Sequence, residues 1–129
     1  MNKIIVEVSI GELLDKISIL EIKLEKIKDP QKLKFITNEH SILKNQLDKN
    51  VESNEKLSEL FQSLKEINTR LWKIEDDKRQ CEKDKDFGEK FIKLSRDVHF
   101  LNDDRAKIKL EINNLTGSTI KEIKEYTSY

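Results

Sequence analysis

Apolar side chains recur at alternating steps of three and four residues through most of this 129-residue chain. This spacing places them along one face of a helix. The clearest series follows Phe87 and consists of Phe91, Leu94, Val98, Leu101, Ile108, Ile112 and Leu115. Similar series run through three earlier stretches, so the chain is constrained to form long amphipathic helices that must each bury one face.

Capping residues indicate where these helices begin and end. Ser9 followed by Glu12 has the pattern of a capping box. Asp29 directly before Pro30 predicts the cap and first residue of a second helix. Gly117 follows the last periodic residues and is typical of a helix end.

We predict a single domain over residues 1–129. The expected fold is an all-α antiparallel helical bundle, or coiled-coil hairpin, with a short N-terminal β-strand. The strand is expected because Ile4, Val6 and Val8 alternate along the chain, and it needs the C-terminal tail or a second copy as its partner. The predicted elements are a strand at 3–8, helices at about 10–28, 30–49, 54–83 and 87–116, and a tail at 118–129 that is either a helical turn or extended.

The two later helices are longer than the two earlier ones. At about 1.5 Å per residue, the later pair measures roughly 45 Å and the earlier pair roughly 28 Å. The short pair cannot cover the whole apolar face of the long pair. We therefore predict a homo-oligomer, most simply a two-fold dimer.

Composition excludes several classes of protein. Because 25 basic and 25 acidic side chains balance, no basic excess favours nucleic-acid binding. The chain has no stretch of about 20 consecutive apolar residues, so no membrane-spanning helix is predicted. Cys81 is the only cysteine, which rules out an intrachain disulfide framework and agrees with a cytoplasmic location.

Arg105 occupies a position where the helix pattern calls for an apolar residue, with Asn102 and Lys109 about one turn away on either side. A buried guanidinium needs an acidic partner, a bound anion or access to water. In one interpretation its stem covers apolar surface while its head meets one acid. In the other, the three side chains bind a carboxylate or phosphate, with Arg105 as a bidentate donor.

Glu75 and Asp76 are weak candidates for a divalent-cation site, because such cations prefer several converging carboxylates. A solvated helix face is the simpler interpretation, although Glu75 borders the apolar face. Along an antiparallel hairpin, Glu75 and Arg105 are offset by roughly 15 Å. They can share a site only across a dimer or through a residue of the first helix, for which Glu21 is the best candidate.

Three stretches of the chain together resemble a family of small bacterial helical proteins known only as a domain of unknown function. They are Val8–Lys23 (VSIGELLDKISILEIK), Leu71–Asp77 (LWKIEDD) and a third stretch around Asn102–Ala106 (NDDRA). The resemblance supplies no activity, but it implies a shared polar site. The polar residues of the family pattern are Glu12, Asp15, Lys16, Glu21, Lys23, Glu75, Asp76, Asp77, Asn102, Asp103 and Arg105.

Two functions are consistent with these features. The first is a non-catalytic helical oligomer that scaffolds or binds another protein, with no cofactor, and we favour it. The second is a ligand-binding or catalytic bundle for an anionic substrate, in which Arg105 holds the anion, Lys109 adds charge and Glu75 acts as a base or as a ligand of Mg²⁺ or Mn²⁺. The candidate site residues are Glu21, Glu75, Asn102, Arg105 and Lys109.

Overall fold

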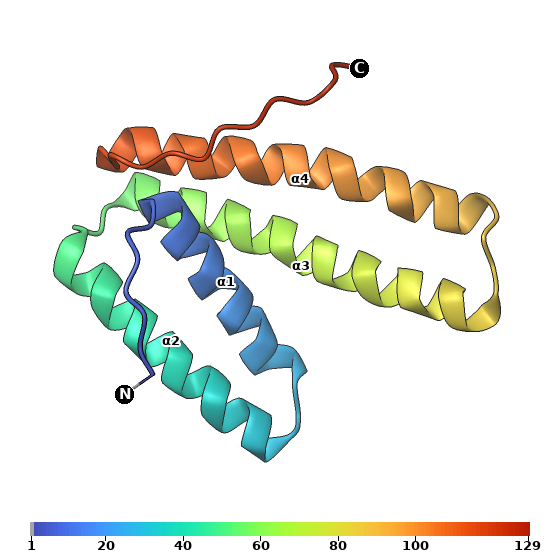
Figure 1. Ribbon diagram of the computed structural model, residues 1–129, viewed down its shortest axis with the longest axis horizontal. Coiled ribbons are helices and arrows are strands. Elements are labelled where there is room, and N and C mark those ends of the chain that lie inside the picture. The colour runs from blue at the N-terminus through green and yellow to red at the C-terminus, as the bar shows by residue number, and fades with distance from the viewer. Residues whose placement is uncertain (1) are drawn as a thin grey trace.

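The computed structural model describes residues 2–129 and confirms the all-α fold as a four-helix bundle (Figure 1). The start of the last helix lies two residues later than the sequence indicated. The helices are α1 (Ile10–Lys26), α2 (Pro30–Asn50), α3 (Glu55–Asp84) and α4 (Glu89–Thr116).

Local chemistry defines most of the helix ends. The Ser9 side chain accepts a hydrogen bond from the backbone of Glu12 at the start of α1. The Asp29 and Asn54 side chains cap α2 and α3 in the same way. Lys85, in the left-handed conformation with φ of 57°, ends α3 and turns the chain back into α4.

The helices form two hairpins that diverge like the arms of a V (Figure 1). One arm is α1 with α2, and the other is α3 with α4. Helix α1 packs closely against all three other helices, whereas α2 packs closely against α1 alone. Helix α1 is therefore the element that joins the two arms.

The apolar core lies at the closed end of the V. It consists of buried leucine and isoleucine side chains from α1, the first half of α3 and the last turns of α4. The half-buried Phe61 packs against this cluster from α3, and Leu47 does so from α2. The buried members are Leu14, Leu57, Leu60, Leu64 and Ile112.

The predicted strand at residues 3–8 is wrong. Residues 2–8 are extended but unpaired, and Ile4 is 89% exposed. Residues 118–129 adopt no regular secondary structure, and their hydrogen bonds go to α4 and, from Ile10 N to Ser118 Oγ, to the start of α1 rather than to residues 2–8. The alternating pattern therefore has no neighbouring strand to pair with among the described residues.

Helix α1 covers only part of the longer hairpin. Its 17 residues span roughly 26 Å, whereas the 30 residues of α3 span roughly 45 Å. The distal half of the α3–α4 hairpin, on both sides of Lys85, consequently has no third helix packed on it (Figure 1). Within residues 2–129, no helix is both long and apolar enough to cross a lipid bilayer.

The close approach of α1 to α4 depends on Gly11. A Cβ atom at this position would lie 2.6 Å from the backbone oxygen of Lys109. We expect Gly11→Ala to lower the free energy of unfolding by roughly 1–3 kcal/mol in urea denaturation, because the backbone cannot move aside cheaply. Gly88→Ala is the matched control, since its Cβ would meet only Asp86 Oδ1 at 3.4 Å. Equal losses in the two variants would contradict this account.

Candidate functional site

The centre of the polar site is Asp15, whose side chain is 1% exposed between α1, α3 and α4. Arg105 Nε donates to Asp15 Oδ1 at 2.9 Å, and Arg105 Nη2 pairs with Asp15 Oδ2. Asn68 Nδ2 donates at 2.8 Å both to Asp15 Oδ1 and to the hydroxyl of Ser18. A buried carboxylate is thus held by a bidentate cation and an amide from two other helices.

Arg105 is therefore already paired within the chain. The hydrogen bond to Asp15 raises the pKa of Arg105 and outweighs the opposing effect of burial. Its remaining Nη1 lies 3.5 Å from Asn102 Oδ1, so these two predicted site residues do meet. Among the described residues, no buried side-chain nitrogen or oxygen lacks a hydrogen-bond partner.

Lys109 extends the network toward the C-terminal tail. Its Nζ lies 2.7 Å from Glu12 Oε2, 2.9 Å from Glu122 Oε2 and 4.0 Å from Asp15 Oδ2. Burial acts to lower the pKa of Lys109, but its hydrogen bonds to Glu12 and Glu122 raise the pKa above its ordinary value. The same contact holds the pKa of Glu122 below its ordinary value. Lys109 is only 8% exposed, so it is an internal cation with internal partners.

Glu21 does not join this network, which corrects its expected bridging role. It pairs instead with Lys65 and His40, each at 3.3 Å. Asp15 and Glu21 point about 120° apart around the helix axis at 3.6 residues per turn, so they face different neighbours. Asp15 is the residue of α1 that meets Arg105.

A groove between α1 and α3 brings Glu75 and Arg105 to one surface, although no direct bond joins them. Its volume is about 410 Å³. Apolar side chains of α1 and the half-buried Trp72 of α3 line it, together with Glu75, Asp76, Arg79 and Arg105. We call this feature the α1–α3 groove; its full lining is Ile19, Ile22, Asn68, Leu71, Trp72, Glu75, Asp76, Arg79 and Arg105.

Glu75 and Asp76 lack the companions that a metal site needs. Within residues 2–129, no three side chains of His, Cys, Asp or Glu gather closely enough to hold an ion. Since divalent cations are bound by several converging oxygen ligands, two adjacent acids on one helix face are an incomplete set.

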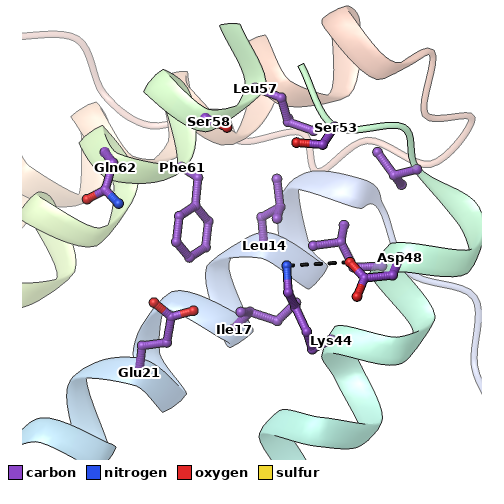
Figure 2. A pocket seen from close by; sticks show the side chains of 12 residues that line it. Leu14, Ile17, Glu21, Lys44, Asp48, Ser53, Leu57, Ser58, Phe61 and Gln62 are labelled. Atoms are coloured by element: carbon purple, nitrogen blue, oxygen red, sulfur yellow. Dashed lines mark ion pairs between the residues drawn. The ribbon is translucent and has the colours of Figure 1, made fainter. Parts of the chain in front are cut away.

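Two smaller cavities lie away from the groove. The pocket in Figure 2 has a volume of about 180 Å³ and lies between α1, α2 and α3. Leu14, Ile17 and Phe61 form its apolar wall, and the pair Lys44–Asp48 lies at its rim (Figure 2). A second cavity of about 170 Å³, the tail pocket, is lined by three lysines of α4 and the tail. They are Lys107, Lys109 and Lys124.

Asp15 and Asn68 were not among the candidate site residues, although Asp15 is one of the polar residues of the family pattern. A detectable pattern exists for Asp15, because Gly11, Asp15, Ser18 and Ile22 follow one another at steps of four, three and four. This second stripe of α1 faces the long hairpin, where Gly11 N donates to Asn113 Oδ1 at 2.7 Å. For Asn68 the sequence alone carries no comparable pattern.

The Asp15–Arg105 pair can be tested by removing its cation. Arg105→Leu leaves a buried carboxylate without its partner, so we expect a loss of roughly 3 kcal/mol in unfolding free energy. The double variant Asp15→Leu with Arg105→Leu should lose less than the two single variants added together. Lys73→Leu, which breaks an exposed pair with Asp77, is the control and should change stability by less than about 0.5 kcal/mol. Strictly additive losses would exclude the coupling.

The contact between Glu122 and Lys109 predicts a pH dependence. Because the pKa of Glu122 is lowered in the folded state, its stabilisation is complete above the ordinary value of 4.5 and is lost as pH falls through the lowered pKa. The gap in unfolding free energy between the native chain and Glu122→Gln should be about 0.5 kcal/mol at neutral pH, because Glu122 is partly solvated. The gap should close in acid; a gap independent of pH would refute the assignment.

Comparison with known proteins gives a family but no activity. Neither a curated protein nor a solved structure shows significant similarity to the chain. A family model described as a family of unknown function, DUF6165, matches residues 4–129. This confirms the resemblance carried by the three motif stretches. Because the match covers nearly the whole sequence, the chain belongs to the DUF6165 family of unknown function.

Proposed function

We propose that this protein is a non-catalytic helical interaction module that assembles with a second copy of itself. The observation that carries the proposal is the uncovered distal half of the α3–α4 hairpin. A two-helix hairpin buries only the seam between its helices, so apolar side chains on its other faces remain partly exposed. Assembly would supply the missing third layer.

The state of the polar residues supports the same function. Asp15, Arg105 and Lys109 are engaged with one another or with neighbouring side chains. A catalytic acid, base or electrophile needs a donor or acceptor atom that is free to bond to a substrate. In this network the hydrogen bonds and ion pairs join one helix to another, so they hold the helices together, as a scaffold requires.

Apolar surface and charge also favour self-association. Phe87 and Ile92 are exposed near the turn of the long hairpin, and Phe87 packs edge-on against Phe91 with ring centroids 5.5 Å apart. Because the chain has no formal net charge, two copies meet without long-range repulsion.

A measurement of molar mass tests this function directly. Light scattering during size-exclusion chromatography of the native chain should give, at high concentration, a mass near twice the 15.3 kDa of one copy. The apparent mass should fall on dilution as the dimer dissociates. A mass of one copy at every concentration would overturn the proposed assembly.

The tail pocket is the observation that favours a second candidate function, the binding of an anionic ligand. Three lysines line it, and Glu122 is the one acid among its lining residues. A carboxylate or phosphate group would compete there with Glu122 for Lys109. Of the residues predicted to bind an anion, this site retains Lys109, whereas Lys107 and Lys124 take the place of Arg105.

Thermal denaturation with inorganic phosphate or citrate, with and without Mg²⁺ or Mn²⁺, tests the second candidate. Binding should raise the melting temperature, because a ligand that binds only the folded state stabilises it. The increase should be larger for Glu122→Gln, which removes the internal competitor, and smaller for Lys124→Gln. No increase in any of the three proteins would exclude an anion site for these ligands.

A further inference from the structure

The α1–α3 groove has an apolar floor and a rim on which acidic and basic charges do not balance. Ile19 and Ile22 of α1 face Leu71 and Trp72 of α3 across it. On the rim, Arg105 is neutralised by Asp15, whereas Glu75 and Asp76 have no ion-pair partner among the described residues. With Arg79 as the remaining cation, the free rim charge is acidic. The chemistry of the groove therefore suits an apolar helix face flanked by basic residues.

The outer face of α2 has this chemistry. Phe35 is 77% exposed and Ile42 is 53% exposed. They are seven residues apart, which places them on the same helix face about two turns from one another. Lys34 directly precedes Phe35, and Lys32 lies one turn before Phe35. Glu39 lies between Phe35 and Ile42, so two basic residues and one acid accompany the apolar pair. Since α2 packs closely only against α1, its outer face has no helix covering it.

We propose that the outer face of α2 from a second copy docks in the α1–α3 groove, and that the exchange is reciprocal. The α1–α2 arm of each copy enters the V of the other, with Phe35 and Ile42 against Trp72. Each copy offers one groove and one complementary arm, so a two-fold arrangement satisfies both and closes the dimer. This inference rests on the proposed function and names the surface through which assembly occurs.

Charge supports this occupant over the alternative in which two long hairpins pack directly on one another. Lys32 and Lys34 outnumber Glu39, the one acid beside Phe35 and Ile42, so this part of the arm brings net basic charge to the rim where Glu75 and Asp76 lie. Opposite potentials on two surfaces steer their encounter and select one orientation. In the alternative arrangement, Phe35 and Ile42 would stay exposed in the dimer.

The first test places a charge on the arm. Phe35→Glu should weaken dimerisation by roughly tenfold or more, as measured by sedimentation over a range of concentration. Its circular dichroism should match that of the native chain, and its melting curve should match that of the native chain diluted until the dimer dissociates, because Phe35 lies on an exposed helix face. Ile123→Glu is the matched control, since Ile123 is an 81% exposed residue of the tail and its change should leave the dimer intact.

Trp72 supplies an independent measurement because it is the only tryptophan in the chain. In the native dimer its fluorescence should be protected from iodide quenching, and dilution should remove the protection. Phe35→Glu should be quenched like the diluted native chain at every concentration. Equal quenching in the native dimer and in Phe35→Glu would overturn the docking of the arm in the groove.

Charge exchange tests the pairing itself. Lys34→Glu alone and Glu75→Lys alone should each weaken the dimer, and the chain that carries both should recover affinity. The outcomes separate the two proposals. A native chain that is monomeric would exclude both the proposed self-assembly and the docking of the arm in the groove. A native dimer that is unaffected by Phe35→Glu would exclude only the docking inference and would indicate that the long hairpins pack on one another.

Discussion

The fold depends on one buried carboxylate. Asp15 has lost nearly all contact with water, and an isolated charge in such a place would be costly. It is tolerated because Arg105 and Asn68 reach it from two different helices. A different rotation or axial position of α1 would move Asp15 away from these two partners. We infer that the pair selects this placement of α1 among the other ways in which its apolar faces could pack.

The V shape follows from that placement. Gly11 and Asp15 bind α1 to α4 near one end of the long hairpin, and the core leucines close the same end. Beyond this point α1 diverges from α3 and carries α2 away with it (Figure 1). The opening between the arms and the uncovered hairpin thus have a single cause, because the first arm is fixed at its N-terminal end.

The helices could be predicted from the sequence because they depend on local rules, namely periodicity and capping. Arg105 was recognisable as a site residue for the same reason, since it interrupts a regular apolar series. Asp15 was named only through the family pattern and not as a candidate site residue, because α1 was assigned one apolar face, whereas contact with three helices buries most of its surface. The strand at 3–8 was wrong because strand formation requires a partner elsewhere in space, which a local alternation of Ile4, Val6 and Val8 cannot supply.

The family motifs divide into two groups by what their polar residues contact. In the first and third stretches, Asp15 and Arg105 bind each other across the helices, so their polarity is accounted for by internal structure. In the second stretch, Glu75 and Asp76 line the open groove without an ion-pair partner among the described residues, whereas Arg105 lines the same groove while bound to Asp15. A motif whose side chains are not used inside the molecule is best explained by what lies outside it. The groove is therefore the surface through which the proposed docking would act, and the contact between Asp15 and Arg105 of the first and third motifs holds it in shape.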